Sequence, residues 1–305
     1  MILHPRNPSI WTLLFSIKGS IIPVIWRKVM FTVLISSAVV ALHGTLYHYK
    51  VTLTATPFTL WGLTLAIFLA FRNTVAYQRF WEARTLWGEL LVVSRNLARQ
   101  CHTLVPGLSA EERRRLGDLL AAYCYALKDS LRAERLGADA LRLLDPSTRA
   151  ELEGCRNMPN VLLGLIGRRL LARARDSGAG EMVQVELDQQ LTRLAYVQGG
   201  CERIKHTPIP YPYILMLHRV VHIYCVLLPF CLVDSIGWFT PLAVCVLAYT
   251  FFGLDALGDQ IADPFDTQPN DLPLDALCRN IEIAVRELLG EPAPEPVEPV
   301  GNLLL

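Results

Sequence analysis

Long apolar runs alternate along this chain with polar segments that have helical periodicity. Residues 29–47 are uncharged and close to the ~20 residues that a helix needs to cross a bilayer core. Three more apolar runs cover residues 58–71, 214–233 and 237–254. Together the runs predict four transmembrane helices. Residues 8–26 are also apolar, but Gly19 and Pro23 interrupt them, and we expect a helix at the membrane surface there.

The second apolar run carries two rows of side chains at helical spacing. The large row recurs every four residues and consists of Leu63, Ile67 and Phe71. The small row follows the same interval and consists of Gly62, Ala66 and Ala70. Copies of this helix, packed through the small row, would direct the large row at an axis as stacked hydrophobic rings that pass ions only when wetted. The commoner arrangement for such a row is contact with lipid or with another helix.

Residues 85–206 contain no run long and apolar enough to cross a membrane, but helical periodicity is plentiful. Ser109 and Glu112 have the spacing of a capping box, and Asp145 and Asn157 precede further expected helices. Prolines at 208, 210 and 212 forbid a regular helix where the chain returns to the membrane. We therefore expect a layer of helices in the cytosol, with its first helix continuous with the second span.

Charge sets the expected orientation. Arg27 and Lys28 precede the first span and Arg72, Arg79 and Arg84 follow apolar residues of the second, whereas the loop between the two spans carries Lys50 alone. Positive residues favour the cytoplasmic side, so both termini should lie in the cytoplasm. The expected organisation, in chain order, is an N-terminal interfacial segment (1–28), two spans with the neck (29–84), a cytosolic helical region (85–208), two spans (209–258), a C-terminal segment with an amphipathic helix at 274–289 (259–290) and a flexible tail (291–305).

Composition agrees with a membrane protein and excludes other classes. The 305 residues are 52% hydrophobic and carry a formal charge of +1, which gives no basis for nucleic-acid binding. Eight cysteines without a C-x-x-C pair indicate reduced, buried thiols. No G-x-S-x-G, P-loop or Rossmann glycine pattern is present, so we expect neither an enzyme nor a cofactor.

Two groups of polar residues lie near membrane helices. Asp255 and Asp259 stand one turn apart near the cytosolic end of the fourth span, where they either attract cations or form a solvated helix end. His218 and His222 have the spacing of a metal pair, but without a nearby carboxylate in sequence an interior polar pair between helices is favoured. No metal site is predicted.

Three motifs carry a resemblance to a known family. They are FRNTVAYQRFWEARTLWG at 71–88, GGCERIKHTPIPYPYILMLHR at 199–219 and ADPFDTQPNDLPLDAL at 262–277. Together they resemble the bestrophins, in particular the bacterial branch. The resemblance implies an all-α homopentameric ion channel with four spans per subunit, a large cytosolic helical region and a neck formed by Leu63, Ile67 and Phe71. It also implies a second, cytosolic aperture at Val185, with Met182 as the weaker match.

Two departures from the animal members of the family affect the expected activity. At the middle position of the neck, animal members carry an aromatic residue, whereas this chain has Ile67, as bacterial members do. Because the bacterial members resemble sodium-permeable channels, we expect this chain to conduct monovalent cations. The acidic run after the N-P-F motif of animal members has only Asp266 and Asp271 here, which makes activation by calcium doubtful. The alternatives are a chloride channel of the same architecture and a non-conducting membrane scaffold or sensor whose helical region binds a partner.

Overall fold

The computed structural model describes residues 10–11, 16–17, 19–42, 45–46, 49–50, 54–300 and 303–304. The chain divides into two compact units. The span unit contains described residues up to Phe80 together with 208–263, and the bundle unit contains 81–207 and the chain from Pro264 onward. Almost all regular structure is helical, and the one strand pair among the described residues joins β1 (Thr45–Leu46) and β2 (Tyr49–Lys50) in antiparallel register.

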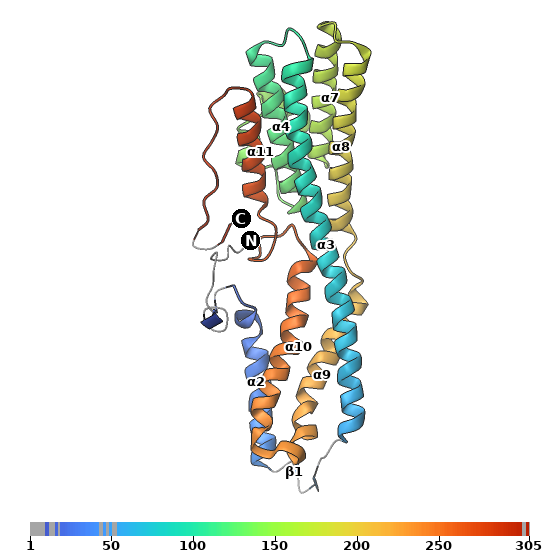
Figure 1. The fold of residues 1–305 in the computed structure, drawn as a ribbon, viewed down its shortest axis with the longest axis vertical. Coiled ribbons are helices and arrows are strands. Elements are labelled where there is room, and N and C mark those ends of the chain that lie inside the picture. Colours follow the sequence, from blue (N-terminus) through green and yellow to red (C-terminus); the bar gives the residue numbers. More distant parts are fainter. Residues whose placement is uncertain are drawn as a thin grey trace. The chain divides into compact units, whose positions relative to one another are not determined.

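The span unit consists of long apolar helices around one hydrophobic core. Its elements are α2 (Ile22–Ala41), the first part of α3 (Ala55–Leu104), α9 (Tyr211–Ile236), the 3-10 helix η1 (Gly237–Phe239) and α10 (Thr240–Ala262). Within this unit, α2, α9 and α10 run side by side (Figure 1). The core includes Leu65, Leu69, Val221 and Phe252. Three segments are long and apolar enough to cross a membrane, namely Ile22–Ala41, Thr56–Leu104 and Tyr211–Ala262.

The start of the first apolar helix differs from the prediction. Helix α2 begins at Ile22, seven residues before the expected start at 29, and it ends at Ala41. Pro23 is the reason, because proline is tolerated in the first turn of a helix, where its missing N–H has no helical partner. The expected surface helix at 8–26 is therefore wrong for Ile22–Trp26, which belong to α2. In its remainder, residues 8–9, 12–15 and 18 lie outside the described residues.

The third segment contains two helices with a reversal between them. Gly237 ends α9 with a φ of 50°, a left-handed conformation that favours glycine, and α10 begins only at Thr240. The chain therefore turns back at 237–239 rather than starting its next helix at 237 as the sequence predicted. The break predicted from the prolines is confirmed, because no helix is assigned between His206 and Tyr211.

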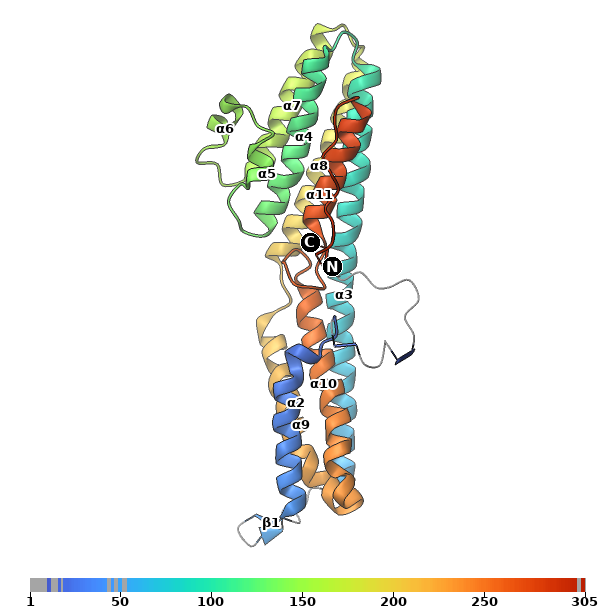
Figure 2. The same ribbon diagram turned by 90° about the vertical axis from the view of Figure 1, so that its left-hand side faces the viewer.

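The bundle unit packs the second part of α3 with the remaining helices. These are α4 (Ala110–Leu131), α5 (Ala138–Leu141), α6 (Pro146–Leu152), α7 (Met158–Asp176), α8 (Glu181–His206) and α11 (Leu274–Leu288). The short helices α5 and α6 lie to one side of α4 and α7 (Figure 2). The predicted capping box is confirmed, because Glu112 N–H donates to Ser109 Oγ and Ser109 N–H donates to Glu112 Oε2. All eight cysteines are free and six are buried, also as predicted.

Candidate functional site

The large apolar row of α3 is uncovered in the single chain. Leu63, Ile67 and Phe71 are 59%, 47% and 63% exposed. The buried face of the same stretch holds Leu65 and Leu69. Since each residue advances a helix by 100°, the two faces lie on nearly opposite sides of α3. One face packs into the span unit, and the other presents three large apolar side chains outward.

The small row is divided between the two faces. Gly62 is buried, and a Cβ at this position would collide with the hydroxyl group of Tyr224. The Tyr224 ring in turn stacks on Phe58 with 4.6 Å between ring centroids. Gly62 therefore allows close packing inside its own chain. Ala66 and Ala70 are exposed, and their contact with another copy stays a prediction.

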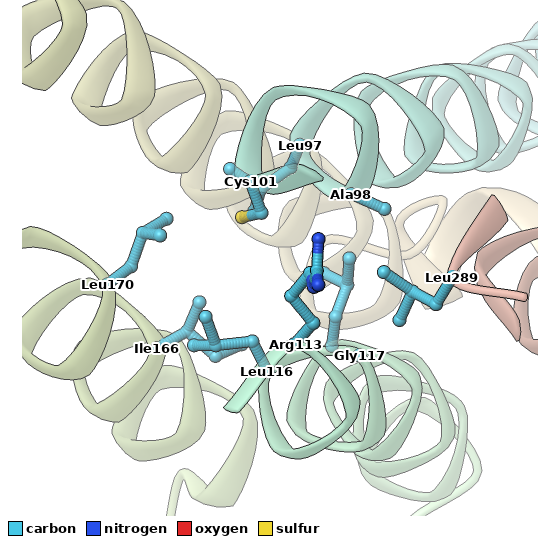
Figure 3. A pocket seen from close by; sticks show the side chains of 10 residues that line it. Leu97, Ala98, Cys101, Arg113, Leu116, Gly117, Ile166, Leu170 and Leu289 are labelled. Carbon is cyan, nitrogen blue, oxygen red and sulfur yellow. The ribbon is translucent and has the colours of Figure 1, made fainter. Parts of the chain in front are cut away.

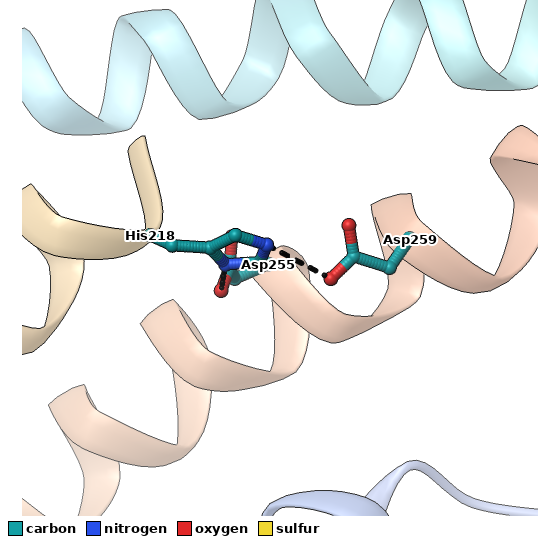
Figure 4. A group of neighbouring side chains, drawn as sticks. All are labelled: His218, Asp255 and Asp259. Carbon is teal, nitrogen blue, oxygen red and sulfur yellow. Dashed lines mark hydrogen bonds and ion pairs between the residues drawn. The ribbon is translucent and has the colours of Figure 1, made fainter. Parts of the chain in front are cut away.

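A buried polar cluster begins one residue after Phe71. The guanidinium of Arg72, with a side chain only 1% exposed, donates from Nη1 to Asp255 Oδ1 at 2.6 Å and from Nη2 to Asp259 Oδ1. On the other side, His218 Nδ1 lies 2.5 Å from Asp255 Oδ2, and its Nε2 lies 3.3 Å from Asp259 Oδ2. Figure 4 shows the imidazole of α9 between the two carboxylates of α10. Each carboxylate thus uses one oxygen for Arg72 and the other for His218.

This cluster changes the interpretation of two sequence predictions. Asp255 is 1% exposed, so it is not part of a solvated helix end, whereas Asp259 is partly exposed. Arg72 and His218 face all four oxygens of the two carboxylates, and the role of these carboxylates in attracting cations stays a prediction. His218 does have carboxylate partners, which the sequence did not reveal because Asp255 lies 37 residues further along the chain.

Further bonds fix α3 to α10 on either side of the cluster. Asn73 Nδ2 donates to the carbonyl of Leu254 at 3.1 Å, and Arg79 Nε donates to the carbonyl of Ala262 at 3.1 Å. Gly258 lets Asn73 approach, since a Cβ there would overlap Asn73 Oδ1. The polar side chains that follow Phe71 on α3 therefore bind groups of α10 within the span unit.

The same cluster contains the one group of three metal-ligating residues found in the described part of the chain. The ligand atoms of His218, Asp255 and Asp259 lie within 4.8 Å of one another. All four carboxylate oxygens already face Arg72 or His218, so a divalent cation would have to displace the guanidinium or the imidazole from them. The donor set thus fits an ion-pair cluster better than a resident metal.

Val185, the expected second aperture residue, lies near the beginning of α8 and is 51% exposed; Met182 is exposed as well. The next side chain, Glu186, accepts hydrogen bonds from Gln100 Nε2 at 2.9 Å and from Gln190 Nε2 at 3.3 Å. The first of these bonds links α8 to α3 beside Val185, and the second lies within α8. The aperture itself stays a prediction.

A small cavity in the bundle unit is apolar and does not suit a ligand. Its volume is about 10 Å³, room for roughly one water molecule. Figure 3 shows it enclosed by side chains that include Leu97, Cys101, Leu116, Ile166 and Leu289. The uncovered row of α3 and the cluster beside it therefore remain the candidate functional site.

Comparisons with known proteins point to one family. The sequence model of the family described as Bacterial/Fungal Bestrophin protein matches residues 1–287. A voltage-dependent anion channel-forming protein of Mesorhizobium japonicum is 41% identical over 295 residues, which cover 97% of this chain and 94% of that protein. A protein of the same description from Escherichia coli K12, YneE, is 34% identical over 95% of each chain. The crystal structure of a bacterial bestrophin homologue from Klebsiella pneumoniae superposes with a TM-score of 0.83 at 36% identity, covering 88% of this chain and 99% of the other.

Proposed function

Because the chain belongs to the bacterial and fungal bestrophins, a family of membrane channels rather than enzymes, we propose that it conducts monovalent ions passively through a hydrophobic neck. The neck consists of Leu63, Ile67 and Phe71 from each of five identical subunits around one axis. Hydrophobic rings do not bind ions, so they impose an energy barrier on ion passage. This barrier becomes lower when the neck widens enough for water to enter it. Val185 forms a second constriction on the cytosolic side.

The exposure of the large row is the observation that carries this proposal. A helix that packs its opposite face into its own chain leaves three large apolar side chains without cover, at one-turn intervals. Uncovered apolar rows mark surfaces that meet lipid or another protein chain. A neighbouring copy of α3 around an axis covers the flanks of the row through Ala66 and Ala70 and leaves the row itself facing the passage.

The remaining topology follows from helix lengths. Helices α9 and α10 have 26 and 23 residues, and at about 1.5 Å per residue each is long enough to cross the ~30 Å apolar core of a bilayer. With α2 and the first part of α3, this gives four spans. Both termini then lie in the cytoplasm, and the channel resides in the bacterial inner membrane.

Two ions are candidates on different grounds. The relatives from Mesorhizobium and Escherichia are described as anion channel-forming proteins, which favours chloride. The resemblance to bacterial bestrophins with an aliphatic middle ring favours sodium. The reversal potential of purified channels in a NaCl gradient separates the two, because a cation channel and an anion channel give opposite signs.

Flux into liposomes tests the neck. Ile67→Ala and Phe71→Ala each widen a ring and should raise ion flux above that of the wild-type protein. Val246→Ala is the matched control, since Val246 is an exposed apolar residue of α10 and its truncation should leave flux unchanged. A non-conducting scaffold would give no flux in the wild type and none in either neck variant.

A further inference from the structure

We propose that Arg72 is the positioning residue of the neck: its ion pairs with Asp255 and Asp259, balanced by His218, hold α3 back on its own subunit and keep the Phe71 ring from closing. The inference rests on the proposed neck. It assigns the polar cluster a task in conduction in addition to its contribution to stability.

The first support is the place of Arg72 on α3. It directly follows Phe71, but it lies on the buried face, whereas Phe71 lies on the uncovered one. Both partners of its guanidinium belong to α10. At 100° per residue, Arg72 points about 140° away from the mean direction of the large row, so a pull on Arg72 towards α10 draws the helix away from the side on which the row projects. With this connection lost, α3 can shift towards the axis and narrow the ring.

The second support is the charge balance of the cluster. Both ring nitrogens of His218 face carboxylate oxygens, and an ionised carboxylate only accepts hydrogen bonds. A neutral imidazole has one donor nitrogen, so this geometry fits the doubly protonated ring. Two cations, Arg72 and His218, then offset two anions, Asp255 and Asp259. Arg72 and Asp255 are the buried members, with side chains 1% exposed, and a buried ion pair tolerates the loss of one member poorly because the remaining charge is left without compensation.

The neighbourhood of the His218 imidazole includes groups from α3, α9 and α10. The charged groups that face the imidazole are Asp255 and Asp259 from α10, with Arg72 of α3 on their other oxygens. On its own helix, His222 Nδ1 lies 2.6 Å from the carbonyl of His218.

The test places Arg72→Gln in two backgrounds. In the wild-type background it should lower flux by at least about fivefold, the lower end of typical coupling between sites. In the Phe71→Ala background, Arg72→Gln should change flux little, because the ring of Phe71 side chains that would narrow is absent. A folding defect would instead lower flux in both backgrounds, and that result would overturn the proposal.

Two further measurements keep the test decisive. If Arg72→Gln does not assemble, the double variant Arg72→Gln with Asp255→Asn removes one charge of each sign and takes its place in both backgrounds. His218→Gln removes the side chain that contacts both carboxylates and should lower flux in the wild-type background; an unchanged flux would contradict the role of the cluster. Failure of the neck itself gives a different result, since Phe71→Ala alone would then not raise flux.

Discussion

At the scale of single residues, Gly258 is the position where the fold leaves least room. A Cβ there would overlap Asn73 Oδ1 and lie 3.6 Å from Cζ of Arg72. Gly258→Ala should therefore displace Asn73 from the Leu254 carbonyl and lower the free energy of unfolding by about 1–3 kcal/mol, the usual cost of overpacking. Thermal unfolding of the detergent-solubilised protein measures this change.

Gly253 provides the matched control on the same helix. A Cβ at Gly253 would lie 3.5 Å from Ile21 Cγ2 and 3.8 Å from Ile25 Cδ1, which are ordinary contacts. Because alanine favours a helix over glycine by roughly 1 kcal/mol, Gly253→Ala should leave the melting temperature unchanged or raise it. Equal losses from the two variants would show that α10 responds to any added side chain and not to the approach of Asn73.

At the scale of elements, α11 is held on α4 by charge as well as by apolar contact. Asp275 Oδ1 accepts from Lys128 Nζ at 2.6 Å, and Asp275 Oδ2 accepts from Arg132 Nη1 at 2.7 Å. Both basic side chains are buried. Asp275→Asn leaves them without their shared anion and should lower the free energy of unfolding by about 2 kcal/mol. Asp176→Asn, at an exposed end of α7, should change it by less than about 0.5 kcal/mol.

The pH dependence of that difference has a defined sign. Burial raises the pKa of Asp275, but the hydrogen bonds from Lys128 and Arg132 outweigh it and hold the pKa below its ordinary value of 3.8. A carboxyl group with a depressed pKa stabilises the fold above its ordinary pKa, and this stability is lost as pH falls through the depressed value. The gap in melting temperature between wild type and Asp275→Asn should therefore be constant near neutral pH and shrink below about pH 4. A gap that widens in acid would contradict the ion-pair explanation.

Local signals in the sequence predicted the helices well. The last helix was expected at 274–289 and is observed at Leu274–Leu288. The capping pair Ser109 and Glu112 marked the start of α4, because the cap is a contact between residues three positions apart. The continuity of α3 from the apolar run into the polar segment was also predicted and is confirmed. Pro23 was misread as a break, since a proline begins a helix as readily as it ends one.

The polar cluster could not be predicted in the same way. Arg72 and Asp255 are separated by 183 positions, and no periodicity within one helix specifies which carboxylate meets which base. The sequence did give one usable signal, because a charged residue directly after an apolar run needs a partner or water. What it lacked was the packing of α3, α9 and α10 that supplies the partners.

At the scale of the whole molecule, assembly is the property on which conduction depends. Ala66 and Ala70 are exposed in the single chain and flank the large row of α3, so we expect them where neighbouring copies meet. Ala66→Leu should separate those helices and shift the mass of the detergent-solubilised complex from that of the proposed pentamer towards smaller species. Ala38→Leu, at an exposed position of α2, is the control and should keep the wild-type mass. An Ala66→Leu protein with unchanged mass and flux would show that α3 does not pack against its copies through Ala66. That result would contradict the helix packing on which the proposed neck depends.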